Sequence, residues 1–174
     1  MFMRNVLLLG SLVCFSGVAM ADDNPRLGVP VDEATVVAIN FTVLPNGEGL
    51  PAGSGNSIRG EAIYARDCLA CHGEKGQKGV SDVLVGGHGT IASASPNRTV
   101  GSYWPYATTL FDYIRRAMPY TAPGSLTNNE VYALTAYILF LNGIVDEQDM
   151  MTAETLADVR MPNRDNFIWA YTPK

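Results

Sequence analysis

Apolar residues recur at helical spacing in the central part of the chain, starting with residues 57–68. In this first predicted helix, Ser57 is the expected N-cap, and Ile63 and Tyr64 lie on one face. Gly60 lowers the helix propensity, so we expect another helix to approach closely at that position.

Two further helices are predicted later in the chain. One covers residues 110–117, with Thr108 or Thr109 as its cap, and ends at Pro119. The other begins at Thr127, where the sequence T-x-x-E has the form of a capping box, and its apolar positions recur at intervals of three and four residues until Gly143. This last helix is apolar almost all round, which indicates a packed core helix.

The remaining segments are mostly irregular. Residues 32–40 can form a short helix, and a loop rich in glycine and proline follows at 45–55. The acidic residues 144–174 show one possible short helix near 153–159, and the aromatic end of this tail is expected to pack on the domain or on a partner. No repeat is visible and strands are few, so we predict an all-α fold.

The first 21 residues have the features of a secretory signal peptide. Arg4 supplies a positive charge, residues 6–18 are apolar, and residues 19–21 read Ala-Met-Ala, a cleavage site of the A-x-A type. The alternative is an uncleaved N-terminal anchor. Because of the signal peptide we expect an exported, periplasmic protein. After cleavage no stretch approaches the about 18 continuous apolar residues of a membrane span.

These features predict four parts of the chain. They are a signal peptide at 1–21, an extension and linker at 22–56, a helical domain at 57–143, and a C-terminal acidic tail at 144–174. The whole chain has 12 Lys and Arg against 17 Asp and Glu, and loss of Arg4 with the signal leaves 11 against 17, a net charge of −6. An acidic chain of this kind argues against a nucleic-acid partner and suits docking to another protein.

The strongest chemical signal is Cys68-Leu-Ala-Cys71-His72. Two cysteines three positions apart, followed directly by a histidine, are typical of covalent c-type haem attachment. Both thiols can then add to haem vinyl groups, while the histidine reaches the iron. A zinc site is one alternative, but His88 is the only other histidine. A dithiol redox motif is another, but it is typical of a βαβ context that this chain lacks.

An iron held by one histidine has a sixth coordination position. Met118 is the preferred ligand, because it follows a predicted helix and precedes a proline in an irregular loop. His88 is the alternative ligand, and a buried core methionine is the alternative role for Met118. An open or labile sixth position would instead indicate a haem enzyme.

Other residues are candidates for the edge of the cofactor. Tyr103, Trp104 and Tyr106 can cover the haem or belong to an ordinary aromatic core. Arg115 and Arg116 can neutralise a propionate, face a partner, or simply face water.

The order of CxxCH, Met-Pro and an apolar final helix over residues 57–143 resembles a class I cytochrome c. Three longer stretches resemble the haem subunits of periplasmic sulfite and sulfane dehydrogenases. They are residues 99–119 (TVGSYWPYATTLFDYIRRAMP), 126–137 (LTNNEVYALTAY) and 161–167 (MPNRDNF).

The resemblance implies a class I cytochrome c fold around one covalent haem c, with Cys68 and Cys71 as thioethers and His72 and Met118 as iron ligands. It implies an electron-transfer protein whose partners are a molybdenum-containing sulfur-compound dehydrogenase and a downstream cytochrome or oxidase. The single CxxCH favours a monohaem subunit. Many relatives have a proline carbonyl that orients the proximal histidine, and this chain has Asp82 there.

Overall fold

The computed structural model describes residues 27–168 and 170, and the predicted signal peptide lies outside them. The chain divides into two units, residues 1–39 and 40–174. The first contains helix α1 (Glu33–Ile39), at whose start the Thr35 amide donates to Asp32 Oδ1 at 2.8 Å. Among the described residues, no helix is long and apolar enough to cross a membrane.

The second unit is built on the crossing of α2 (Ser57–Asp67) and α5 (Asn128–Leu141). A β-carbon on Gly60 would lie 2.0 Å from the Ala133 carbonyl oxygen, so only glycine allows this approach. The predicted close contact at Gly60 is thereby confirmed. The capping box at Thr127 and Glu130 is also present, with both reciprocal hydrogen bonds formed.

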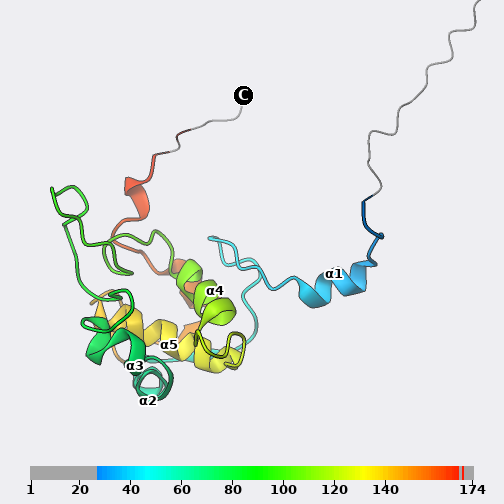
Figure 1. Ribbon diagram of the computed structural model, residues 1–174, viewed down its shortest axis with the longest axis horizontal. Helices are drawn as coiled ribbons and strands as arrows, with labels where there is room; N and C mark the ends of the chain where they lie inside the picture. Colours follow the sequence, from blue (N-terminus) through cyan, green and yellow to red (C-terminus); the bar gives the residue numbers. More distant parts are fainter. Residues whose placement is uncertain (1–26, 169, 171–174) are drawn as a thin grey trace, which may run out of the picture. The chain divides into compact units, whose positions relative to one another are not determined.

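Helix α4 (Ala107–Ala117) packs against α5 (Figure 1). It begins three residues earlier than predicted, and neither Thr108 nor Thr109 is its N-cap, which is Tyr106. Thr108 is buried and its hydroxyl reaches the Pro45 carbonyl at 3.3 Å, so tertiary packing extends this helix. The N-cap of α2 is likewise Asn56 rather than Ser57, because the Asn56 side chain accepts from the Arg59 amide.

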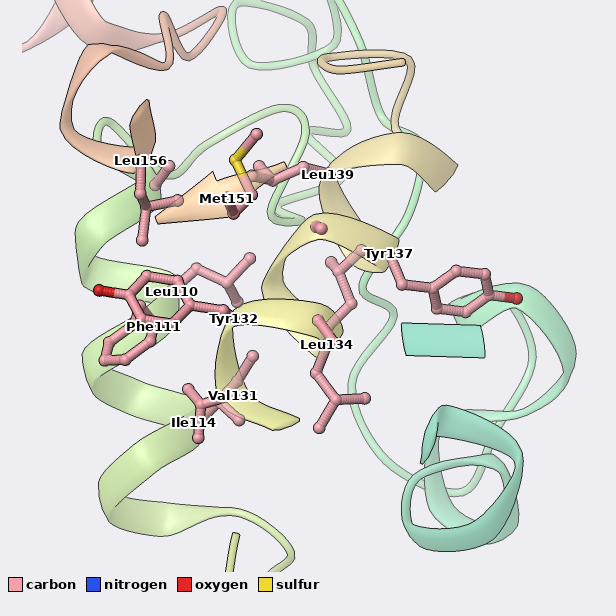
Figure 2. Close-up of a cluster of buried hydrophobic side chains, with 14 of the residues drawn as sticks. Leu110, Phe111, Ile114, Val131, Tyr132, Leu134, Tyr137, Leu139, Met151 and Leu156 are labelled. Atoms are coloured by element: carbon pink, nitrogen blue, oxygen red, sulfur yellow. The ribbon is translucent and has the colours of Figure 1, made fainter. Parts of the chain in front are cut away.

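The core lies between α4, α5 and the chain that follows α5 (Figure 2). Phe111 and Tyr132 pack with ring centroids 4.5 Å apart, and both are fully buried. Leu110 and Ile114 of α4 face Val131 and neighbouring residues of α5. This core makes the two helices a rigid support for the loops at their ends.

The tail that follows α5 packs on the same unit. Strand β2 (Met151–Thr152) pairs antiparallel with β1 (Ser54–Gly55) and leads into α6 (Ala153–Asp158), the short helix expected there. A 3₁₀ turn, η2 (Arg164–Asn166), follows. Leu156 and Met161 are buried in the core. Of the aromatic end, Phe167 packs on Tyr103, whereas Trp169 and Tyr171 lie outside the described residues.

Candidate haem site

One cavity of about 390 Å³ collects all four site residues predicted from the sequence. Cys68, Cys71 and His72 line the cavity from the segment that follows α2, and Met118 lines it from the segment that follows α4. Two sequence segments far apart therefore bring two thiols, an imidazole and a thioether to one space.

A short helix, α3 (Leu69–His72), presents the CxxCH residues. The amides of Cys71 and His72 both donate to the Cys68 carbonyl, at 3.1 and 2.9 Å, so both cysteines and the histidine share one turn. The following loop returns onto this turn: the Ser81 amide donates to the Cys71 carbonyl at 2.9 Å. A β-carbon on Gly79 would lie 1.9 Å from that same carbonyl oxygen, so the turn and the loop are in backbone contact.

The orientation of His72 is set by Asp82. The His72 Nδ1 atom lies 2.9 Å from the Asp82 carbonyl oxygen, which can only accept, so Nδ1 is the protonated nitrogen. The Nε2 atom is then free to bind a metal, as in metal-binding histidines whose other nitrogen donates to a carbonyl. A backbone carbonyl does not depend on the residue type, so an aspartate at position 82 can supply it.

Asn142, at the end of α5, holds the loop that carries this carbonyl. Its Oδ1 accepts from the Gly86 amide at 3.1 Å, and its Nδ2 donates to the carbonyls of Leu84 at 3.2 Å and Ile138 at 2.8 Å. The Leu84 amide also donates to the Gly76 carbonyl at 2.8 Å. Sequence reasoning missed Asn142, because its role depends on a contact with a loop more than fifty residues away.

Met118 stands where α4 ends and the chain becomes extended. Its amide still donates to the Ile114 carbonyl at 3.0 Å, which fixes the position of the residue relative to the helix. The side chain is partly buried and packs against the core. Its position at a helix end beside an apolar cavity suits a thioether ligand.

The wall of the cavity is largely apolar. Leu110 and Ile114 of α4, Leu134 and Ile138 of α5, and Val100 line it. Such a wall suits a flat macrocycle and keeps water from an iron centre, and the size of the cavity is typical of cofactor sites. The donor set and the apolar wall together fit a haem.

The alternative chemistries have less support. Burial, with the carboxylate of Asp67 nearby, raises the pKa of the Cys68 thiol to about 12. A dithiol redox motif has the opposite shift, because its attacking cysteine must be a thiolate. Among the described residues, no group of three or more His, Cys, Asp or Glu is arranged to hold a metal ion.

The other sequence candidates have mixed positions. His88 is exposed and does not line the cavity, so the geometry does not favour it as an iron ligand. Trp104 lines the cavity and packs edge-to-face on Tyr113, with ring centroids 5.7 Å apart. Tyr103 and Tyr106 are not among the lining residues. Tyr103 lies beneath Arg98, which does line the cavity, and Tyr106 lies beneath Arg164.

Arg115 and Arg116 do not border the cavity, whereas Arg98 does. The guanidiniums of Arg115 and Arg116 lie over the Phe41 ring, at 5.6 and 4.8 Å, and neither residue lines the cavity. Arg98 does line it, and sequence reasoning missed it because nothing in its polar loop distinguishes it from an ordinary surface arginine.

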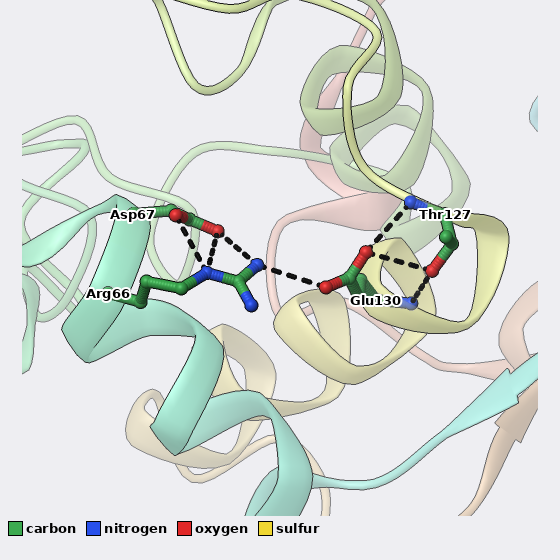
Figure 3. A network of polar contacts seen from close by, with 4 residues as sticks. All are labelled: Arg66, Asp67, Thr127 and Glu130. Carbon is green, nitrogen blue, oxygen red and sulfur yellow. Dashed lines mark hydrogen bonds and ion pairs between the residues drawn. The ribbon is translucent and has the colours of Figure 1, made fainter.

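A polar network links α2 to the start of α5 and includes Asp67, which lines the cavity (Figure 3). The Arg66 guanidinium binds Asp67 at 2.6 Å and Glu130 at 2.9 Å, and so links α2 to the start of α5. Hydrogen bonds from the Thr127 backbone and from Arg66 lower the pKa of Glu130 to about 2. Asp67 also lines the cavity, and Arg66 neutralises its charge there.

Comparisons with known proteins agree with this geometry. A sequence profile of the family "Cytochrome C oxidase, cbb3-type, subunit III" matches residues 56–138. A chain of the crystal structure of the sulfane dehydrogenase SoxCD from Paracoccus pantotrophus is 37% identical, with a TM-score of 0.75, over 83% of this chain and 71% of that one. A comparison with curated proteins gives no match.

Proposed function

Because the chain belongs to the c-type cytochromes with the class I fold, we propose that it is a periplasmic monohaem electron carrier. Cys68 and Cys71 would hold the haem covalently, and His72 and Met118 would be the side chains that bind its iron. The general role, haem-based electron transfer, follows from the family.

The observation that carries this assignment is the convergence of the four residues on one cavity. The CxxCH turn and Met118 come from different segments, yet all four residues line the same apolar space. The hydrogen bond from His72 Nδ1 to Asp82 further supports an iron ligand with a fixed orientation.

The protein's contribution is to hold the ligands and exclude water. When bound, a haem with histidine and methionine ligands supplies one-electron chemistry at a raised reduction potential. The backbone contacts of the CxxCH turn hold His72, and the end of α4 holds Met118. The apolar side chains of α4 and α5 keep the surroundings dry, so the site needs little rearrangement on a change of charge.

Similarity to the sulfane dehydrogenase SoxCD supports a specific donor. We infer that this chain accepts electrons from a molybdenum-containing sulfite or sulfane dehydrogenase and passes them to another cytochrome or an oxidase. The acidic surface of the chain suits docking to a protein partner.

The test uses the chain produced in a host that matures c-type cytochromes. After denaturation and acid–acetone extraction, the haem is expected to stay with the protein, and a Cys68→Ser, Cys71→Ser double variant is expected to lose it. Mass spectrometry should show one haem per chain. Haem that extracts freely from the unaltered protein would contradict covalent attachment.

The donor is tested separately by adding sulfite and the purified dehydrogenase to the oxidised cytochrome. Reduction that requires both additions supports the proposed partner. A haem that stays oxidised would contradict the proposed partner but not the proposed role as an electron carrier. Rapid binding of cyanide or carbon monoxide to the native protein would instead support a haem enzyme with a labile sixth position.

A further inference from the structure

Arg98 is a positively charged residue in the wall of the cavity. Among the described residues that line the cavity, it is the one lysine or arginine. The lining carboxylates are Asp67 and Asp82, and Asp67 is already paired with Arg66 at 2.6 Å. Arg98 has no ion pair with a carboxylate among the described residues. Within the part of the chain that the structure describes, a positive charge therefore borders the cavity without a carboxylate counter-ion.

The Arg98 guanidinium is held by an aromatic ring rather than by an acid. It lies over the Tyr103 ring, 5.5 Å from the centroid, which is cation–π geometry. A stacked guanidinium keeps its edge N–H groups available, and these match the two oxygens of a carboxylate.

Tyr103 is in turn fixed by the C-terminal segment. Asn163 is buried, and its Nδ2 donates to the Tyr103 carbonyl at 2.8 Å. The Phe167 ring packs edge-to-face on the Tyr103 ring, with centroids 5.5 Å apart. This segment lies beyond residue 138, where the family profile ends. The tail thus supports a ring at the edge of the cavity.

We propose that Arg98 is a cofactor-binding residue that pairs with a propionate of the haem, and that Phe167 is a positioning residue acting on it through Tyr103. This inference rests on the proposed function, because it takes haem as the occupant of the cavity. Haem carries two propionates, and the cavity offers them one uncommitted guanidinium. Arg115 and Arg116 do not line the cavity, so they do not compete for this role.

The pairing is tested by the midpoint reduction potential of the purified, haem-loaded protein. Removing a positive charge beside the haem favours the oxidised form, so Arg98→Gln lowers the potential. At a fixed ambient potential the reduced-to-oxidised ratio falls about three- to tenfold, and tenfold corresponds to about 59 mV for one electron. Arg98→Lys, which keeps the charge and loses the planar fork, gives a smaller fall.

Arg115→Gln is the matched control, since it removes the same charge from a side chain that stacks on Phe41. Its potential is expected to stay close to that of the unaltered protein. If Arg98→Gln shifts the potential no more than Arg115→Gln does, the propionate pairing is wrong.

The positioning role is tested by a double-mutant cycle with Phe167→Ala. Phe167 is half-exposed, so its truncation should leave the fold intact, and circular dichroism checks this. Phe167→Ala is expected to lower the midpoint reduction potential when Arg98 is present and to leave it unchanged in the Arg98→Gln background. Equal shifts in both backgrounds, or no shift in either, would overturn the role of the tail.

These outcomes are separable from a failure of the proposed function. A preparation that binds no haem under maturation conditions contradicts the carrier itself. A protein with normal low-spin haem and an unchanged potential in Arg98→Gln contradicts only the pairing.

Discussion

Gly60 of α2 lies directly against the backbone carbonyl of Ala133 in α5. A β-carbon on Gly60 would be 2.0 Å from that oxygen and 2.7 Å from the β-carbon of Tyr137. The helix that leads into the CxxCH turn and the final helix therefore meet through backbone. This contact sets the position of α3 relative to the wall of the cavity.

Gly60→Ala is expected to destabilise the protein by about 2–3 kcal/mol. An added methyl group cannot move the carbonyl of a packed helix, and the resulting overpacking exceeds the gain of up to about 1 kcal/mol in helix propensity. Urea denaturation measures the change in the free energy of unfolding.

Gly124→Ala is the control for this change. A β-carbon there meets no atom within 4 Å, and the cost is confined to the backbone, whose φ is +74°. We expect a loss of about 1 kcal/mol. If both variants cost the same, the backbone contact at Gly60 is not important for stability.

Asn142→Leu is expected to lower the free energy of unfolding by about 2–3 kcal/mol, because it leaves the buried partners of the amide unsatisfied. Those partners are the Gly86 amide and the carbonyls of Leu84 and Ile138. The same change frees the loop that carries the Asp82 carbonyl, so the NMR signal of the His72 ring N–H should broaden. Denaturant unfolding and NMR are the two measurements.

Asn128→Leu provides a matched comparison on the same helix. Its Nδ2 makes one hydrogen bond, to the Ala52 carbonyl at 3.3 Å, at the surface. The expected loss is below about 1 kcal/mol, and the His72 signal should not change. An Asn142→Leu protein as stable as Asn128→Leu would refute the role of Asn142.

Glu130 makes stability depend on pH in the acid range. Its pKa is about 2 in the folded protein against an ordinary value of 4.5. The stabilisation is complete above about pH 4.5 and is lost as the pH falls toward 2. Since the Arg66 side chain is 58% exposed, solvent screens the ion pair, and we expect a contribution of about 1 kcal/mol.

Glu130→Gln removes the contribution of the ionised Glu130 to the free energy of unfolding, and with it the dependence of that contribution on pH. The free energy of unfolding should differ from that of the unaltered protein at pH 6, and the difference should shrink as the pH approaches 2. A constant difference across that range would show that the lowered pKa of Glu130 does not stabilise the fold.

Local sequence features predicted much of this protein. The CxxCH spacing, the capping box at Thr127 and Glu130, and the need for glycine at position 60 all depend on neighbouring residues or on simple periodicity. The placement of Met118 beside the cavity agrees with its sequence position, a helix end followed by proline, and its role as an iron ligand stays a prediction.

The features missed from the sequence depend on contacts between distant segments. The pairing of two-residue strands β1 and β2 has no periodic signal, and the early start of α4 results from packing of Thr108 near Pro45. Arg98 and Asn142 have ordinary neighbours in sequence, so only the folded chain distinguishes them. The Asp82 carbonyl is a backbone group, and residue type carries no information about it.

The most direct test of the account is the absorption spectrum of the oxidised holoprotein and of two methionine variants. The unaltered protein should show a low-spin c-type spectrum with a methionine–iron charge-transfer band. Met118→Ala should lose that band, whereas Met150→Ala, at a half-exposed position, should keep it. A band that survives in Met118→Ala, or a high-spin spectrum of the unaltered protein, would contradict ligation of the iron by Met118.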